Sequence, residues 1–179
     1  MNILIIILVI LAGLIGLILF TALFSKKGYS IGREITIDKP RQTVFDYIKH
    51  LKNQDHFSKW VMTDPNLKKE FRGTDGTVGF VYAWEGNKQA GKGEQEIKRI
   101  AEGERLDIEI RFEKPFEAIA QTPFVTESIS ENKTRVKWDM ISTMKYPMNF
   151  MLLFMDMDKL LGKDLEISLK NLKGILERS

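Results

Sequence analysis

The chain has 179 residues and a formal net charge of +3, with 27 basic and 24 acidic residues that are interspersed from Lys26 onward. This mixed distribution argues against a nucleic-acid partner, which would need a concentrated basic surface. The sequence has no cysteine and only two histidines, His50 and His56, so disulfides, thiolate nucleophiles and zinc–thiolate centres are excluded.

The first segment, Ile3–Phe24, contains no charged residue. As a helix it would be about 33 Å long at ~1.5 Å per residue, enough to cross a hydrocarbon core of ~30 Å. A cleaved signal peptide is the competing interpretation, but its apolar core is only ~7–15 residues long and follows a basic start. Here the run is longer, no Lys or Arg precedes it, and residues 21–25 make a poor cleavage site. The sequence therefore predicts an uncleaved transmembrane anchor over residues 1–25.

Basic residues follow the apolar segment. Lys26, Lys27 and Arg33 come after it, whereas only the terminal amine precedes it. The positive-inside rule therefore predicts a single-pass membrane protein whose folded domain lies on the cytoplasmic side. We expect residues 26–30 to form a juxtamembrane linker and residues 31–179 to form one domain. The membrane is thus one expected partner, through residues 3–24.

The domain is predicted to begin with a strand and a short helix. Ile31, Ile35 and Ile37 lie on one face of an alternating stretch that ends before Pro40. Residues 40–51 then place apolar side chains at helical spacing, which predicts a short helix. A polar link follows, and it leads to Phe57 and Trp60.

Six further strands are predicted after this helix. They cover residues 67–72, 78–85, 91–100, 105–113, 118–129 and 134–143. The links between them are short and rich in turn residues, so we expect an antiparallel meander. In the strand 105–113, Leu106, Ile108, Ile110 and Phe112 alternate with charged residues, which predicts one buried side and one solvent-facing side.

The last stretch, from Pro147 to Leu176, is predicted to be one long helix. Its apolar residues recur at steps of three, four or seven and form one stripe that the sheet can bury. The stripe consists of Met148, Leu152, Met155, Gly162, Leu165, Leu169, Leu172 and Leu176. The front half is apolar on nearly every side, with Phe150, Leu153 and Phe154 off the stripe. We expect this surplus apolar surface to form a hydrophobic mouth beside the membrane.

This order of elements resembles the helix-grip fold of the START and Bet v 1-like superfamily and, within it, the bacterial polyketide cyclase/dehydrase-like SRPBCC proteins. The resemblance covers about residue 29 to the end. The stretches that carry it are Ile35-Thr-Ile-Asp-Lys-Pro40, Val44, Phe45, Ile48, Trp60, Asp64-Pro65-Asn66, Val81-Tyr82-Ala83-Trp84-Glu85-Gly86-Asn87, Gly91-Lys-Gly93, Phe112-Glu-Lys-Pro-Phe116, Thr134-Arg-Val-Lys-Trp138 and Met155-Asp-Met-Asp-Lys-Leu-Leu-Gly-Lys-Asp164. It implies an α+β fold in which an antiparallel seven-stranded sheet wraps around the long C-terminal helix, preceded here by one transmembrane helix. It also implies one cavity, which the family uses for lipid carriage, ligand sensing or occasional catalysis.

Other patterns that can carry chemistry have simpler explanations. Gly73, Gly76 and Gly79 lie between strands, without the Lys-Ser/Thr that follows a phosphate-binding loop, so we interpret them as turn glycines. His50 and His56 lie near acidic residues, but three or four converging ligands are not evident. We therefore expect neither a metal nor a cofactor.

Acidic residues in the strands are candidates for acid–base chemistry. The set is Glu85, Glu94, Glu96, Asp107, Glu109 and Glu113. Alternation places Asp107, Glu109 and Glu113 on the solvent-facing side, and Glu85 and Arg99 are the better candidates for polar groups near a cavity. We assign no catalytic residue. Whether the chain is an enzyme stays open at this point, with a non-catalytic role preferred.

Aromatic and methionine side chains give the strongest indication of function. Each one alone is as well explained by core packing. As a group they suit the wall of an apolar cavity, because ligand sites are concave and mostly apolar and because methionine adapts to irregular shapes. The candidate lining residues are Trp60, Phe80, Tyr82, Trp84, Phe112, Phe116, Phe124, Trp138, Met140, Met148, Met151, Leu152 and Met155.

The sequence thus favours membrane-anchored, non-catalytic binding of a hydrophobic or amphipathic small molecule, such as a lipid, between the sheet and the C-terminal helix. One alternative is a cyclase- or hydrolase-like enzyme that uses the same cavity, which converging titratable groups with shifted pKa values would favour. The other is a cavity-poor interaction or stress protein, which solid packing of the aromatic residues would favour. The sequence leaves the ligand and the oligomeric state undetermined.

Overall fold

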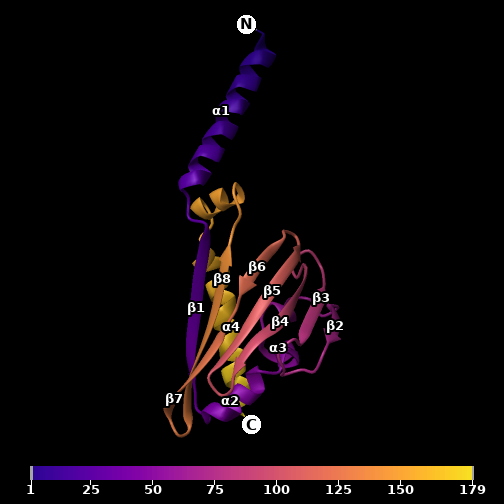
Figure 1. Cartoon of the computed structure of the whole chain (residues 1–179), viewed down its shortest axis with the longest axis vertical. Coiled ribbons are helices and arrows are strands. Elements are labelled where there is room, and N and C mark those ends of the chain that lie inside the picture. Colours follow the sequence, from indigo (N-terminus) through magenta and orange to yellow (C-terminus); the bar gives the residue numbers. More distant parts are fainter. Residues whose placement is uncertain (1, 179) are drawn as a thin grey trace.

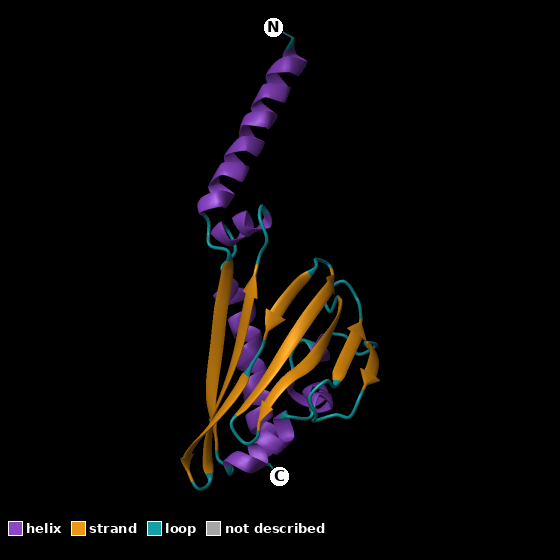
Figure 2. Ribbon diagram, in the orientation of Figure 1, coloured by secondary structure: helices purple, strands orange, loops and turns teal. Residues whose placement is uncertain are grey.

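The computed structural model describes residues 2–178. An antiparallel sheet curves around one long helix, and an apolar helix projects from one end of the sheet (Figure 1, Figure 2). Counted over the described residues, the sheet has eight strands. The predicted α+β helix-grip architecture, a sheet wrapped on a C-terminal helix and preceded by an apolar helix, is therefore present.

The projecting helix is α1 (Ile3–Phe24). It is long and apolar enough to cross a membrane, and its side chains are exposed except at Thr21 and Ala22. Ser25 ends it in an extended conformation, and β1 (Gly28–Ile37) begins three residues later. The strand therefore starts earlier than predicted, inside the expected linker 26–30, because residues 28–30 already pair with β8.

The strands follow one another across the sheet in the order β1, β8 (Lys133–Thr143), β6 (Ala118–Gln121), β5 (Arg105–Lys114), β4 (Lys92–Ala101), β3 (Val81–Glu85) and β2 (Lys68–Arg72). β7 (Phe124–Ser130) pairs with both β5 and β8. The single strand predicted over residues 118–129 is wrong, since Thr122 and Pro123 separate β6 from β7. A proline cannot donate to a strand ladder, so the chain breaks there and the sheet gains its eighth strand.

The antiparallel pairing defines two ends of the sheet. Gly28 of β1 pairs with Thr143 of β8, and Lys114 of β5 pairs with Lys92 of β4. The β3–β4 loop and the β5–β6 loop therefore lie at the end from which α1 leaves, which we call the α1 end (Figure 1). The opposite end, which holds the β7–β8 turn, is called the distal end.

The long helix α4 (Met157–Leu176) lies along the inner face of the sheet. It buries Gly162, Leu165, Leu169, Leu172 and Leu176, which confirms this part of the predicted stripe. Each large apolar side chain buried in this way stabilises the fold by ~1.5–3 kcal/mol. The inward face predicted for the strand 105–113 is also confirmed, because Leu106 and Ile108 are fully buried while Ile110 and Phe112 pack against the core.

The predicted single helix from Pro147 to Leu176 is wrong in its front part. A separate 3-10 helix, η3 (Met148–Leu153), comes first, and α4 starts only at Met157, where the carboxylate of Asp156 accepts a hydrogen bond from Lys159 N at 3.1 Å. The reason is a long-range contact: the buried Asn149 donates through Nδ2 to Ala22 O at 2.7 Å. Because η3 packs on the end of α1, Met148, Leu152 and Met155 do not continue the stripe.

Four short helical segments connect β1 to β2. They are α2 (Arg41–Ile48), η1 (Leu51–Asn53), α3 (Gln54–Phe57) and η2 (Val61–Thr63). α2 corresponds to the short helix predicted over residues 40–51. Val44, Phe45 and Ile48 bury its inner side, as its apolar spacing requires.

Candidate functional site

A cavity of about 250 Å³ lies between the inner face of the sheet and the first turns of α4. The sheet contributes one wall, and α3, η2 and α4 contribute the other. Its lining consists of Tyr29, Gln54, Ser58, Trp60, Val61, Thr63, Leu67, Tyr82, Trp84, Gln89, Ala90, Gln95, Ile110, Phe112, Lys114, Pro115, Trp138, Met140, Met157 and Leu161. Gln89 and Pro115, in the two loops at the α1 end, and Lys114, the last residue of β5, are exposed, so the cavity opens at that end.

The structure brings part of the predicted lining together. Six of the thirteen candidates line the cavity: Trp60, Tyr82, Trp84, Phe112, Trp138 and Met140. Trp84 and Phe112 meet edge to face, with ring centroids 6.0 Å apart, and Trp60 meets Trp138 in the same way at 5.6 Å. Alternation had placed the strand residues of this group correctly on the inner face.

The other seven candidates lie elsewhere. Phe80 and Phe124 are fully buried in the packed core, and Phe116 is 66% exposed in the β5–β6 loop. The remaining four, Met148, Met151, Leu152 and Met155, lie in η3 and the break after it. They miss the cavity because the front of the predicted helix folds onto α1.

The two polar candidates are also misplaced. Glu85 is exposed at the end of β3, outside the cavity. Arg99 lies on the outer face of the sheet and pairs with Asp107 at 2.7 Å. A bulge in the β4–β5 pairing between Ile97 and Arg99 changes the alternation just before Arg99, which residue parity alone does not reveal.

Two buried glutamines of the cavity wall contact each other, and neither was predicted. Gln95 donates through Nε2 to Gln54 Oε1 at 3.2 Å, and both side chains are 4% exposed. Gln95 could have been found, because it stands on the same face of β4 as Gly93 and Ile97. Gln54 lies in the irregular link after α2, where no periodicity indicates which residues face inward.

Two donors in this wall lack a partner. Gln54 Nε2 and Trp138 Nε1 are buried without a hydrogen bond to any described residue. A buried donor left unpaired costs ~1–3 kcal/mol, so such groups usually have an acceptor nearby. Both residues line the cavity. An oxygen atom of a bound molecule is a partner of the right chemistry.

Two tyrosine residues, Tyr29 and Tyr82, also line the cavity. Tyr82 donates to Asp55 Oδ1 at 2.7 Å, and Lys69 pairs with the other oxygen of Asp55 at 2.7 Å. Burial, together with the charge of Asp55, raises the pKa of Tyr82 far above its ordinary value. Burial also raises the pKa of Tyr29, despite a hydrogen bond with Ser142 that lowers it. Both phenols stay protonated at neutral pH, so they can donate hydrogen bonds but not abstract protons.

Polar contacts hold the first turns of α4 against β1. Arg33 donates to both carboxylate oxygens of Asp158, at 2.9 Å each. This hydrogen bond lowers the pKa of Asp158. The arginine crosses α4 at Gly162, where a Cβ would lie only 2.1 Å from Arg33 Nη2. Glycine therefore stands on the buried stripe because a larger residue would displace the arginine.

Ser168 and Asn171 of α4 hold the opposite wall. Ser168 Oγ accepts from Lys59 N at 2.9 Å, and Asn171 Nδ2 donates to Phe57 O at 3.2 Å. These bonds fasten the segment between α3 and η2 to the helix. The cavity is thus enclosed by elements that polar contacts hold in place around it.

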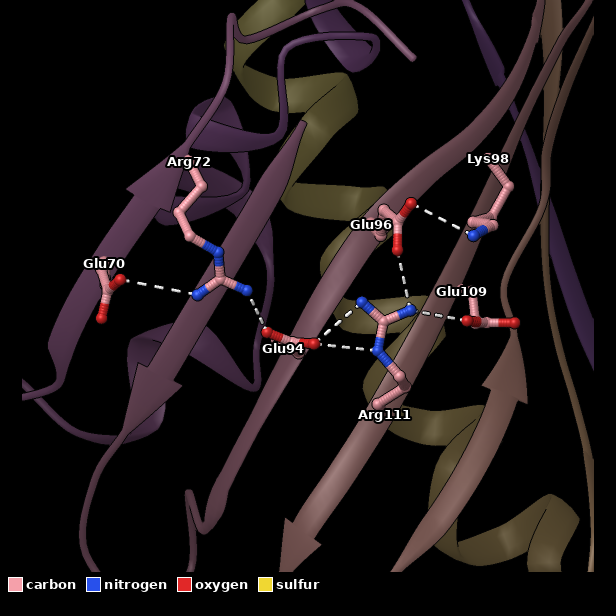
Figure 3. A network of polar contacts seen from close by, with 7 residues as sticks. All are labelled: Glu70, Arg72, Glu94, Glu96, Lys98, Glu109 and Arg111. Carbon is pink, nitrogen blue, oxygen red and sulfur yellow. Dashed lines mark hydrogen bonds and ion pairs between the residues drawn. The ribbon is translucent and has the colours of Figure 1, made fainter. Parts of the chain in front are cut away.

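An ion-pair network covers the outer face of the sheet behind the cavity (Figure 3). Arg111 contacts Glu94 at 2.8 Å, Glu96 at 2.8 Å and Glu109 at 2.6 Å. Arg72, Glu70 and Lys98 extend the network to β2 and along β4. Directly behind it on the inner face, Gln95 pairs with Ile110 and Gly93 with Phe112.

The network shifts the pKa values of its members. The hydrogen bond from Arg72, with a second from Arg111, lowers the pKa of Glu94. Hydrogen bonds from Gln121 and Arg111 lower the pKa of Glu109. Burial alone would lower the pKa of Arg111, but its glutamate partners outweigh burial and raise it. The charged forms are therefore the stable ones at neutral pH.

Comparison with known proteins identifies the class of fold. No family model matches the sequence, and no curated protein sequence matches it. Solved structures do match. Ara h 8.0201 is 15% identical with a TM-score of 0.58, over 85% of this chain and 99% of that chain. The Aha1 dimer from Colwellia psychrerythraea is 14% identical with a TM-score of 0.58, over 83% and 96% of the two chains.

A third similar structure is DynU16, from the dynemicin biosynthetic locus. It is 12% identical with a TM-score of 0.56, over 83% of this chain and 47% of that chain. Structural similarity at such low sequence identities shows a shared fold and does not show a shared function. The chain therefore has a Bet v 1-like helix-grip fold with an additional N-terminal apolar helix, and its activity has to be argued from its own cavity.

Proposed function

We propose that the chain is a membrane-anchored protein that binds a hydrophobic or amphipathic, lipid-like molecule between the sheet and α4. One observation carries the proposal: the cavity of about 250 Å³ has aromatic and aliphatic walls with a few converging polar groups. This is the usual composition of a small-molecule site. The finer resemblance to polyketide cyclase/dehydrase-like SRPBCC proteins is part of the proposal, as is the cytoplasmic position of the domain.

The size of the cavity supports a small or single-chain ligand. Its volume is slightly below the ~300–1,000 Å³ that is common for ligand pockets. Met140 and Met157 lie in its walls, and their unbranched side chains can adjust to the shape of an occupant.

The buried polar groups support an occupant that carries an oxygen atom. Gln54 Nε2 and Trp138 Nε1 need an acceptor, and Gln54 and Gln95 already orient each other. A carbonyl or hydroxyl oxygen on an otherwise apolar molecule would satisfy these donors. A hydrocarbon without any acceptor would leave them unpaired, so we expect an amphipathic ligand in preference to a purely apolar one.

The groups that line the cavity suit binding better than acid–base catalysis. DynU16 comes from a biosynthetic locus, and a cyclase-like reaction is the alternative for this fold. Among the described lining residues, however, no carboxylate or imidazole is present, and Lys114 lies at the exposed rim. The raised pKa values of Tyr29 and Tyr82 leave both phenols without a role as bases near neutral pH.

Native mass spectrometry with lipid extraction tests the proposal on the detergent-purified full chain. We expect one bound molecule per chain, which organic extraction recovers. Leu161→Trp should abolish this adduct, because Leu161 lines the cavity and a larger ring would fill it. Leu160→Trp is the matched control, since the neighbouring Leu160 is exposed and outside the cavity. A chain without any adduct, or an adduct that survives in Leu161→Trp, would contradict the proposal.

A further inference from the structure

We propose that the α1 end of the domain is a membrane-docking surface. It would rest in the headgroup region of the leaflet from which α1 emerges, so that the cavity opens onto lipid and not onto water. The inference rests on the proposed function and deepens it, because it names the source of the ligand as that leaflet.

α1 is fixed to the domain. Only residues 25–27 separate it from β1. Asn149 donates to Ala22 O at 2.7 Å and Tyr146 donates to Leu19 O at 3.4 Å, so residues 146–149 grip the last turns of α1. A bilayer that surrounds α1 must therefore lie directly against this end of the domain.

The cavity opens at the α1 end. Its rim consists of Lys114, the last residue of β5, Pro115 of the β5–β6 loop and Gln89 of the β3–β4 loop. The strand register places both loops at the end where β1 starts and β8 stops. Figure 1 shows the β5–β6 loop and η3 at this same end of the sheet. The cavity opening and α1 therefore lie at the same end of the domain.

Large apolar side chains are exposed at the α1 end. Phe116 of the β5–β6 loop is 66% exposed and Phe154, just after η3, is 76% exposed. Tyr146, Met148 and Leu153 are about half exposed in the same region. Two separate segments thus present aromatic or aliphatic side chains at one end, which is the composition of a surface that enters a membrane interface.

Basic side chains also lie at this end. Lys26, Lys27, Lys114 and Lys145 are exposed at the α1 end. None of the four forms an ion pair within the described part of the chain, and a nearby acidic residue, Glu113, is paired with Lys92 at 2.8 Å. Unpaired lysines beside exposed aromatic residues match an anionic leaflet, which attracts basic side chains near its surface. An anionic lipid surface is therefore the partner to which we commit.

Single-cysteine labelling tests this directly, because the chain has no native cysteine. Phe116→Cys and Phe154→Cys would carry a fluorophore in the full chain, reconstituted in phosphatidylcholine vesicles with and without phosphatidylglycerol. Glu131→Cys is the control, since Glu131 is exposed in the β7–β8 turn at the distal end. We expect nitroxide lipids labelled near the headgroup to quench the labels at positions 116 and 154 several-fold more than the label at 131, and more strongly with phosphatidylglycerol.

Equal, weak quenching at all three positions would overturn the proposal. Labels at 116 and 154 that are shielded from aqueous iodide but not quenched by nitroxide lipid would also overturn it, because a second copy or another protein would then cover the surface. This readout needs no ligand, so docking can hold even if mass spectrometry finds the cavity empty.

A transfer assay tests the link between docking and the cavity. Phe116→Asp should slow exchange of a fluorescent phospholipid between the protein and vesicles several-fold, with an unchanged thermal unfolding midpoint, because Phe116 is exposed. Ile129→Asp is the control, an exposed apolar residue near the end of β7, away from the α1 end. Exchange at the wild-type rate in Phe116→Asp would mean that ligand does not enter through this surface, and would overturn that part of the proposal.

Discussion

The space between the sheet and α4 is solidly packed in its distal half and hollow in its α1 half. In the packed half, Phe124 stacks on Trp138 with centroids 4.4 Å apart, and Phe57 meets Phe124 edge-on at 6.4 Å. In the hollow half, Trp84 and Phe112 are only half-buried and border the cavity. The same sheet and the same helix therefore build both a core and a site.

The difference follows from the side chains of α4 that face the sheet. In the packed half these are the buried Leu165, Leu169 and Leu172. In the hollow half they are Met157 and Leu161, which are only partly buried and line the cavity. The ion pairs around Arg111 lie on the outer face of the strands that border the cavity. We therefore expect them to stabilise the sheet where its inner face borders the cavity.

The largest expected effect comes from a substitution in the packed half. Phe124→Ala should lower the free energy of unfolding by ~3–5 kcal/mol, because the fully buried ring contacts Phe57 and Trp138 and leaves a cavity behind. Denaturant titration of the detergent-purified chain measures it. A loss below about 1 kcal/mol would show that this half is not packed as described.

A substitution in the hollow half should act mainly on binding. Trp84→Ala should cost only ~1–2 kcal/mol of stability, since the half-buried ring borders empty space, although its hydrogen bond to Ala90 O at 3.0 Å is lost. The variant should also bind a fluorescent lipid more weakly. The loss in binding free energy should be at least as large as the loss in the free energy of unfolding. Trp84→Phe is the control that keeps an aromatic wall. Normal lipid affinity in Trp84→Ala would remove this residue from the site.

The outer network should contribute a pH-dependent stability. Arg111→Leu should cost ~1–2 kcal/mol at neutral pH, because three glutamates lose their shared partner. Lowered glutamate pKa values mean that the stabilisation is complete above the ordinary glutamate pKa of about 4.3 and is lost as the pH falls through the lowered values.

The difference between wild type and Arg111→Leu should therefore shrink in acid. Urea unfolding between neutral pH and pH ~3 measures this trend, and the window brackets the ordinary glutamate pKa. Arg135→Leu is a suitable comparison, because that exposed arginine pairs with Glu127 at the distal end of the sheet. A difference that stays constant or grows in acid would contradict the role of the network.

The smallest effect on stability is expected at Gly162, near the start of α4. Gly162→Ala should displace Arg33 from Asp158, but the gain in helix propensity of ~1 kcal/mol offsets much of that loss. Hydrogen exchange in the first turns of α4 should nevertheless become faster. Gly174→Ala on the same helix, where a Cβ would meet only the end of Arg178, is the control and should not show this change.

Most of the fold could be predicted because alternation and helical spacing are local signals. Leu106 to Phe112 and Leu165 to Leu176 show these patterns clearly, and both bury the faces that were predicted. The front of the last helix was mistaken because Met148–Leu153 is apolar enough for a helix, while its true partner, α1, lies more than a hundred residues away in sequence. The proline at position 123 was the available sign that the strand 118–129 would divide.

The site could be predicted only in part for the same reason. Trp84 and Phe112 follow the strand alternation and were placed correctly on the inner face. Whether an inward aromatic residue packs solidly, as Phe124 does, or borders a space depends on what faces it across the sheet and helix. Those contacts depend on how the helix and the strands pack against each other. The residue pattern within one segment carries no information about them.

The pairing of β1 with β8 has a consequence for how the chain is made. β1 follows α1 directly, yet Gly28 pairs with Thr143, which the ribosome adds roughly ten seconds later at ~5–20 residues per second. During that interval the strand has no partner and exposes an open edge. Two chains translated side by side could exchange these strands, with β1 of one pairing with β8 of the other. Assembly errors of this molecule should therefore take the form of strand-swapped dimers.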